Sequence, residues 1–435
     1  MYFSPSKLKP HVLTLALVFL STGLFGSTRA NETVIWNVPR EFDMLSKSNP
    51  EGTLSPKTAT ADAIEAAREF FEDEANTNKR LVLFYPPGRY IFGDDLEGGN
   101  AINIKGFRPG NRGRLVIRGA NQFDTTFVVN HNQNVTEDIN TPAQGGIRVD
   151  TSERIIFSHF HLTVAQQTVS QGTVVAIGGH NGTAEWIDMK IDDGYVDPVT
   201  LATDQAVNGG RYLRRYDVTT DELRPRVDKS INQVLWTHVV ARGNGIYRFF
   251  HPRRSNTPAG TPNHGLEVDD KIAVKCKHGR DPYRFTDCDR IRFSSIRMTR
   301  KTRGLFLRCP NTYVGDIYGH PEWINGKRSR LASPGGGPQF HARFGGFIYA
   351  DAEGRSISSG YEGDVPGLFI ENCIFVNTGD DCLGLFEQAS PIIINCRFFN
   401  SFARSIFDYR CTDLLRELNF EFNSEYIRAT HRRTR

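Results

Sequence analysis

A fixed spacing of apolar residues recurs along the chain. Apolar positions 0, 2, 5 and 7 of the pattern are filled by Ile155, Phe157, Phe160 and Leu162, and again in segments that begin at Ile291, Leu368 and Pro391, with a weaker copy at Thr312. Steps of two place side chains on one face of a strand. The step of three between the two pairs of positions marks a bend, after which the apolar side chains again point inward. The pattern therefore predicts pairs of short strands with a corner, as in one coil of a solenoid.

The two copies nearest the C-terminus lie 23 residues apart, close to one coil of a parallel β-helix. At this offset Asn372 aligns with Asn395, and Cys373 aligns with Cys396. Stacked like residues are what a parallel, in-register solenoid produces. An ordinary β-sandwich with similar strands is the alternative, but a sandwich has no reason to repeat the corner. We therefore predict an all-β fold built on a parallel β-helix.

Other segments predict elements that do not follow the repeat. Residues 60–73 are predicted to form an amphipathic helix that caps the first coil and prevents edge-to-edge pairing. Strand-like stretches at 172–177 and 266–274 interrupt the coils and predict an inserted antiparallel β subdomain. The predicted organisation is a signal peptide (1–30), a cap with the first coils (31–164), the inserted subdomain (165–280) and the coils that carry the site (281–435).

The N-terminus predicts export. Lys7 and Lys9 precede an apolar run from Val12 to Leu20, and small residues follow up to Ala30. This order is typical of a cleaved signal peptide, and the run is too short to span a bilayer. An uncleaved membrane anchor is the alternative. We expect a secreted, periplasmic or extracellular protein with no integral membrane segment after signal removal.

Composition excludes some classes of protein. Hydrophobic residues are 39%, charged residues are 23% and the mean hydropathy is −0.41, which excludes a multi-span membrane protein and a disordered chain. The net charge is only +4, whereas a nucleic-acid binder would show a stronger clustered basic excess. The seven cysteines include no CxxC pair, so no metal site is predicted, and the pairing of disulfides stays open.

The strongest chemical signal is an acidic turn, Gly379-Asp380-Asp381. Crowded carboxylates repel, so at least one pKa rises and a proton stays available for general acid catalysis. Asp351 lies upstream by 29 residues, and we predict that it stands on the neighbouring coil. Three carboxylates could then hold a water and a glycosidic oxygen, as glycoside hydrolysis requires. The alternative is a structural turn with local hydrogen bonds and a salt bridge.

Further residues are predicted to line the same groove. The 23-residue offset places Arg404 under Asp381, where it could neutralise the acids or orient a substrate hydroxyl. Asp408, Arg410 and His341 fall near the same coils and are predicted to bind substrate.

Two weaker candidates precede this region. Trp323, in a loop with His320, could stack on a sugar or pack in the core. The basic cluster of Arg297, Arg300, Lys301 and Arg303 is predicted to be a solvated corner.

Taken together, these motifs resemble the pectin-lyase-like right-handed β-helix glycosidases. The resemblance is greatest to the bacterial alpha-1,3-galactosidases of glycoside hydrolase family 110, and polygalacturonases are more distant. It rests on the entry helix, Pro86-Pro87-Gly88, the stretch 157–177, Gly379-Asp380-Asp381 and Ala403-Arg404-Ser405-Ile406. It implies a right-handed helix and an inverting exo-hydrolase that removes terminal alpha-galactose with Asp351, Asp380 and Asp381, without a cofactor. Polygalacturonases carry Gly-His-Gly where this chain has Ala403-Arg404-Ser405, which disfavours their activity.

The predicted function is therefore a secreted glycoside hydrolase that acts on an oligosaccharide or polysaccharide. A polysaccharide lyase on the same scaffold is one alternative, and an unsaturated product absorbing in the ultraviolet would identify it. A non-catalytic glycan-binding protein is the other, and binding without turnover would identify that. The sequence leaves the sugar, the linkage and the oligomeric state open.

Overall fold

A computed structural model describes most of the chain after the predicted signal peptide. The described residues are 32–92, 100–110, 112–129, 146–165, 167, 169–179, 184–199, 212–216, 233–252, 265–275, 282–300, 302–330, 336–342, 365–378, 381–399, 406–409, 411 and 415–417. The predicted signal peptide (1–30) lies outside them.

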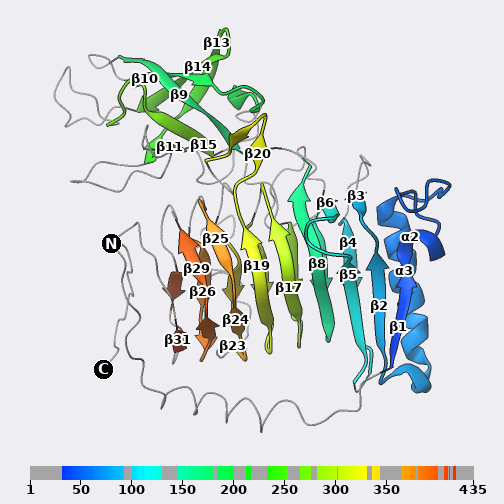
Figure 1. Ribbon diagram of the computed structural model, residues 1–435. Coiled ribbons are helices and arrows are strands. Elements are labelled where there is room, and N and C mark those ends of the chain that lie inside the picture. The colour runs from blue at the N-terminus through cyan, green and yellow to red at the C-terminus, as the bar shows by residue number, and fades with distance from the viewer. Residues whose placement is uncertain are drawn as a thin grey trace, which may run out of the picture.

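Parallel strands stacked one above another form most of the molecule (Figure 1). Within the described residues, thirteen of them make the large parallel sheet: β1 (Thr33–Asn37), β2 (Arg80–Tyr85), β3 (Gly88–Phe92), β5 (Arg114–Gly119), β6 (Thr125–Val129), β8 (Ile155–Val164), β17 (Arg292–Met298), β19 (Tyr313–Gly319), β24 (Phe369–Glu371), β25 (Ile374–Val376), β28 (Ile392–Ile394), β29 (Arg397–Phe399) and β31 (Leu415–Glu417).

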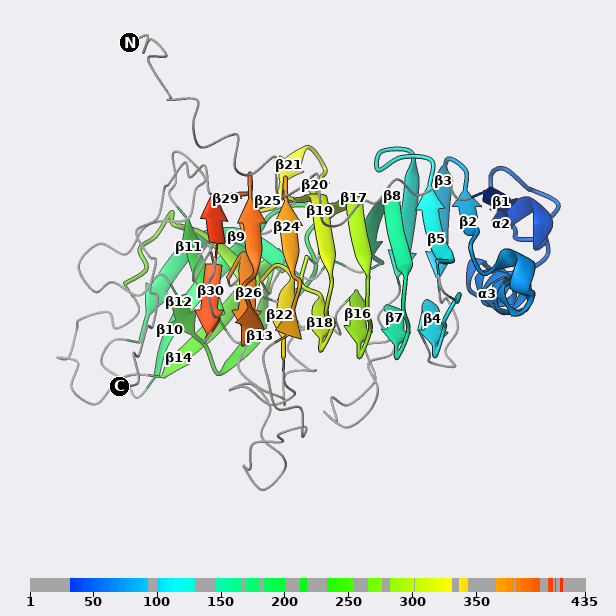
Figure 2. The ribbon, with the colours of Figure 1, turned by 90° about the horizontal axis from the view of Figure 1, so that it is seen from below.

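A second sheet, the small parallel sheet, runs beside the first (Figure 2). Its strands are β4 (Ile102–Lys105), β7 (Ile147–Asp150), β16 (Tyr283–Thr286), β18 (Leu305–Leu307), β22 (Gln339–His341), β26 (Leu383–Phe386) and β30 (Ile406–Tyr409). The chain passes alternately through the two sheets, so each passage through both makes one coil. Two short pairs accompany the coils, β20 (Trp323–Ile324) with β21 (Lys327–Arg328) and β23 (Val365–Pro366) with β27 (Gln388–Ala389).

The predicted apolar repeat is confirmed by the strand register. Phe293 pairs with Phe157 on one side and with Val314 on the other, and Phe375 pairs with Phe398 at the predicted offset. The side chains at the repeat positions are buried in one continuous core. Aromatic rings from successive coils stack there, for example Phe285 on Phe306 and Phe306 on Phe340, with ring centroids 4.8 and 4.7 Å apart.

The predicted bend has a definite backbone conformation. The residues in the step of three have a left-handed φ in each copy: His159 (63°), Ser295 (56°), Asp316 (53°), Asn372 (54°) and Asn395 (50°). Asn and Asp tolerate this region better than other residues with a Cβ. The amide of Asn395 donates to Oδ1 of Asn372 at 2.6 Å, and Asn372 donates to Asp316 at 3.3 Å. Like residues thus stack along the corner, as the sequence predicted.

A helix covers the first coil. Helix α3 (Pro56–Glu72) packs against β3 and β4 and buries Ala63, Ile64 and Phe71 in the core, while the short α2 (Val38–Glu41) and a 3-10 turn (Glu74–Asn76) lie beside it. The helix begins earlier than predicted because Ser55 caps it, accepting from the Thr58 amide at 3.2 Å, and Pro56 occupies the first turn. Figure 1 shows α3 at the end of the stack next to β1.

The segment that interrupts the repeat forms a separate antiparallel sheet, here called the inserted sheet. Its strands are β9 (Val169–Gly178), β10 (Ala184–Ile191), β11 (Tyr212–Tyr216), β12 (Gln233–Leu235), β13 (His238–Gly243), β14 (Ile246–Pro252) and β15 (Lys271–Lys275). They have a core of their own around Trp236 and Phe249. The strand predicted at 266–274 starts only at Lys271, because residues 267–270 form a turn in which the Asp270 carboxylate accepts from the Glu267 amide.

No helix in the described ranges is both long and apolar enough to cross a membrane. The structure describes six cysteines, five of them buried, and shows no disulfide among these six.

Candidate functional site

The predicted acidic turn precedes a strand of the small parallel sheet. Asp381 lies directly before β26 and is half-buried, while its neighbour Cys382 belongs to the core. The Gly337 amide of the preceding coil donates to the Asp381 carbonyl at 2.9 Å. Thr378 is fully buried, and its hydroxyl lies 3.3 Å from the Cys382 thiol. The residues that flank the turn, Thr378 and Asp381, are thus each held by a neighbouring contact.

Glycines make this close approach possible. A Cβ on Gly336 would lie 2.3 Å from the Asp381 carbonyl oxygen, and a Cβ on Gly337 would lie 1.9 Å from the Cys382 carbonyl oxygen. Neither distance is compatible with a side chain. Gly336 and Gly337 therefore let the backbone of the preceding coil come close to the carbonyls of Asp381 and Cys382.

Most of the other predicted site residues lie outside the described residues. This holds for Asp351, Asp380, Arg404 and Arg410. The position stacked on Asp381 in the preceding coil is occupied by Gly336–Gly337, and Asp351 follows β22 in the sequence. That Asp351 lies beside the acidic turn therefore stays a prediction.

The other two predicted substrate-binding residues lie in strands of the small parallel sheet. Asp408 pairs with Leu385 of β26, which in turn pairs with Phe340 of β22. His341 is 6% exposed and stacks on Phe386 with ring centroids 4.0 Å apart. Burial, helped by the charge of Arg303, lowers the pKa of His341 to about 3, so its ring is neutral near pH 7. Such a neutral ring can donate or accept a hydrogen bond, but it carries no positive charge that could pair with a carboxylate.

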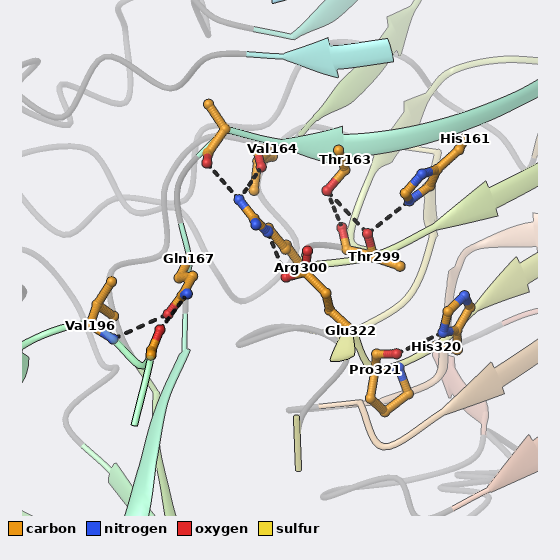
Figure 3. A network of polar contacts seen from close by, with 12 residues as sticks. His161, Thr163, Val164, Gln167, Val196, Thr299, Arg300, His320, Pro321 and Glu322 are labelled. Carbon is orange, nitrogen blue, oxygen red and sulfur yellow. Dashed lines mark hydrogen bonds and ion pairs between the residues drawn. The ribbon is translucent and has the colours of Figure 1, made fainter. Parts of the chain in front are cut away.

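A polar network that the sequence interpretation missed lies where the coils meet the inserted sheet (Figure 3). The His161 Nε2 atom lies 2.8 Å from the Thr299 hydroxyl, which donates to the Thr163 hydroxyl at 3.1 Å. Arg297 pairs with His161 in the register of β8 and β17 and donates to His320 Nε2 at 2.6 Å. Aligning the repeat copies that begin at Ile155 and Ile291 brings these residues together and could have found them.

Arg300 fixes the hairpin β20–β21 to this network. Its Nε atom donates to the Glu322 carboxylate at 2.6 Å, and Nη1 donates to the carbonyls of Val164 and Ala165 at 3.1 and 2.5 Å (Figure 3). The prediction that Arg297 and Arg300 form a solvated corner is therefore wrong, because both side chains are partly buried and paired. Trp323, which follows Glu322, is 66% exposed, so it does not pack in the core.

The histidines of the network are neutral near pH 7. Burial, together with the charge of Arg297, lowers the pKa of His161 to about 3. Burial also lowers the pKa of His320 to about 4, although its bond to the Pro321 carbonyl acts in the opposite direction. Neither ring can supply a proton near neutrality, so the network is suited to positioning rather than to acid catalysis.

The hairpin also contacts the inserted sheet. The Arg330 amide donates to Gln171 Oε1 at 2.7 Å, and its guanidinium lies 3.5 Å from the Asp192 carboxylate. Arg330 is 6% exposed. These contacts hold the exposed Trp323 at a fixed place beside the junction. The described residues contain no group of three or more His, Cys, Asp or Glu side chains placed to hold a metal.

Comparisons with known proteins assign no family to the chain. No family model matches it, and no curated protein matches it. Solved structures similar to it include a candidate glycosyl hydrolase from Parabacteroides merdae (8% identity, 89% of this chain and 95% of that one, TM-score 0.33). Pectin methylesterase PemA from Erwinia chrysanthemi is another (10% identity, 88% and 82%, TM-score 0.32).

A third similar structure is a glycoside hydrolase (11% identity, 85% of this chain and 79% of that one, TM-score 0.32). At these identities and TM-scores the likenesses do not decide what this chain does. Its function must be argued from its own residues.

Proposed function

We propose that the protein is a secreted glycoside hydrolase that cleaves a glycan with an aspartate trio, Asp351, Asp380 and Asp381. The observation that carries the proposal is the setting of Asp381. Its backbone carbonyl accepts from the Gly337 amide of the preceding coil at 2.9 Å, and the two glycines of that coil pack tightly against it. A carboxylate carried on a fixed backbone is suited to proton transfer to a glycosidic oxygen.

The hand of the coils, the type of reaction and the sugar are proposed from the resemblance in sequence. We infer that the coils close into a right-handed parallel β-helix, which is the hand that parallel crossover connections adopt almost without exception. The proposed reaction is inverting removal of a terminal alpha-galactose or a related sugar. Arg404 would orient the acids, and His341, Asp408 and Arg410 would contact the substrate. The exposed ring of Trp323 would offer a flat apolar surface to a pyranose face.

Activity assays with paired variants test this proposal. The full mature chain is incubated with a panel of nitrophenyl glycosides and blood-group-type oligosaccharides, and NMR follows the stereochemistry of the product. We expect Asp381→Asn and Asp380→Asn each to lower kcat by at least 10²-fold, because an amide cannot transfer the proton.

Asp62→Asn, an exposed change on α3, is the matched control and should leave the rate unchanged. Hydrolysis at the wild-type rate in both site variants would exclude the aspartate mechanism. A product that absorbs in the ultraviolet would instead identify a lyase, and binding without turnover would identify a glycan-binding protein.

A further inference from the structure

Arginines gather on the outer face of the large parallel sheet, away from the acidic turn. Arg80 pairs with Arg114 in the register of β2 and β5. Leu115 pairs with Ile155, which sets Arg154 beside Arg114 on the third coil. Successive coils thus place the backbone of Arg114 above that of Arg80 at the strand spacing of about 4.8 Å.

Two more arginines extend this group. Arg118 lies four residues along β5 from Arg114, and Arg292 pairs with Ile156 on the next coil. We call Arg80, Arg114, Arg118, Arg154 and Arg292, with His159 at the corner, the arginine face.

The charges of this face are only partly balanced by the protein. None of its five arginines forms an ion pair with a carboxylate anywhere in the described part of the chain. Burial lowers the pKa of Arg80, and the charges of Arg118, Arg114 and Arg292 lower it further, so these groups lie within electrostatic reach of one another. Asp316 is the acid that acts on His159, and Glu153 and Asp289 act on Arg154.

Several donors of the face also lack a partner. The Nε atoms of Arg80, Arg118 and Arg154 and the Nδ1 atom of His159 are buried and have no hydrogen-bond acceptor among the described residues. Buried donors without a partner are rare in folded proteins because each has lost its hydrogen bonds to water without a replacement. Mutual repulsion and unused donors together indicate that an external anion completes this surface.

Apolar groups run between the arginines. Val82, Val116 and Ile156 form one register column on the outer side of the strands, and Val82 and Val116 are nevertheless buried. Arginine stems on either side explain this burial, since long side chains cover apolar surface with their methylenes. The column continues to Tyr313, where Arg292 lies over the ring at 4.3 Å from its centroid.

The same column ends in aromatic groups. Tyr313 and Phe369 are half-buried and stack with an interplanar angle of 9°. The face therefore combines cations in neighbouring register columns with two half-buried aromatic rings, Tyr313 and Phe369.

This combination fits a linear acidic glycan. In an extended acidic polysaccharide each sugar carries a carboxylate or sulfate on one edge and presents an apolar ring face beside it, at a repeat close to the spacing of the coils. Duplex nucleic acid instead presents phosphates on a curved surface, and the net charge of +4 gives little long-range attraction for it.

We propose that the arginine face binds an acidic polysaccharide, with the anionic groups of successive sugars on the guanidinium groups of successive coils. The choice of a glycan rests on the proposed function, whereas the anion site itself does not. The face lies on β2, β5, β8 and β17 of the large sheet, whereas Asp381 precedes β26 of the small sheet. It would hold an acidic chain on the molecule independently of bond cleavage.

Binding assays on the full mature chain test this inference. The probes are a fluorescent linear oligogalacturonate, a heparin oligosaccharide, a neutral cello-oligosaccharide and a single-stranded oligonucleotide, each measured by anisotropy at low and at high salt. We expect at least one of the two acidic glycans to bind, with an affinity that falls as salt rises, and the neutral one not to bind.

Paired substitutions then locate the site. Arg80→Gln with Arg114→Gln should weaken acidic-glycan binding by roughly tenfold or more, because charge-assisted hydrogen bonds are lost. Arg114→Gln with Arg292→Gln changes only exposed side chains and gives the same test if the first variant is unstable. Lys190→Gln with Arg242→Gln, two exposed changes on the inserted sheet, is the control that removes the same charge.

Three results would overturn the inference: no binding of either acidic glycan, unchanged affinity in a folded double variant, or tighter binding of the oligonucleotide. Hydrolysis by Asp381→Asn is measured separately from binding by the arginine variants, so failure of the catalytic proposal and failure of this inference can be told apart.

Discussion

His161 shows how the coils change the properties of one residue. Its ring is enclosed between strands, contacts the Thr299 hydroxyl and lies near Arg297, Arg300 and Arg89. Each of these arginines and the loss of solvent disfavour a second proton on the ring. A histidine on a free strand would titrate near pH 6.5, whereas this one stays neutral to about pH 3.

This shift predicts an acid dependence of stability. Below about pH 6.5 the unfolded chain binds a proton at His161 that the folded chain does not bind, so the free energy of unfolding falls as the pH falls towards 3. His161→Asn removes this linkage. We expect the variant to lose less stability than the wild type between pH 6.5 and 4, measured by urea unfolding at a series of pH values.

Carboxylates also titrate in this range, so the comparison between variants isolates the histidine. Phe123→Ala, at an exposed side chain that does not titrate, is the control and should keep the slope of the wild type. Parallel curves for His161→Asn and wild type would mean that the ring takes up its proton equally in both states.

At the scale of elements, the distance between coils at the acidic turn depends on two glycines. Gly337→Ala would place a Cβ at 1.9 Å from the Cys382 carbonyl oxygen, so the backbones of β22 and β26 must move apart before both strands begin. We expect a loss of stability of about 1–3 kcal/mol, as for other overpacked sites, and a lower kcat because Asp381 moves with the strand. Thermal unfolding and the hydrolysis assay measure the two effects.

Gly88→Ala is the matched control, since its Cβ would meet Tyr90 at an ordinary 3.5 Å. If Gly337→Ala kept both the stability and the activity of the control, the close approach of the coils would have no role in holding the turn.

The lengths of the corners decide which coils can be predicted from the sequence. The corner repeats with a fixed spacing from His159 to Asn395 because one left-handed residue bends the chain at the same position each time, inside β8, β17 and β19 and between the shorter strands of the later coils, so the pattern is visible in the sequence. The second coil does not show the repeat because its corner is longer: β5 ends at Gly119 and β6 begins only at Thr125. Apolar periodicity cannot align strands across corners of unequal length.

The candidate site was less predictable for a related reason. Contacts between coils depend on the register, and insertions change the offset from one coil to the next. The 23-residue offset holds between the strands around Asn372 and Asn395, but β20 and β21 are inserted in the coil before. Gly336 and Gly337 therefore stack on the acidic turn, which no fixed spacing could have indicated.

At the scale of the whole molecule, stability depends on how the ends of the stack are covered. A coil buries its inward side chains only against its neighbours, so the first coil requires α3. Thr60 of this helix hydrogen-bonds the buried Tyr85 hydroxyl at 2.8 Å, and Phe71 stacks edge-on against Phe107 with ring centroids 5.9 Å apart. The helix thus closes the core and covers strand groups that could otherwise pair with another chain.

Truncation of one capping side chain should therefore have a large and localised effect. Phe71→Ala removes a ring that is 7% exposed, and we expect it to lower the free energy of unfolding by about 3–5 kcal/mol. Because the coils contact only their neighbours, the α3 end should open before the coils near the acidic turn do. Hydrogen exchange should show faster exchange in β2 and β3 but unchanged exchange in β26, and Phe123→Ala, at a side chain that is 69% exposed, should change neither. Equal acceleration in β3 and β26 would show instead that the stack unfolds as one cooperative unit.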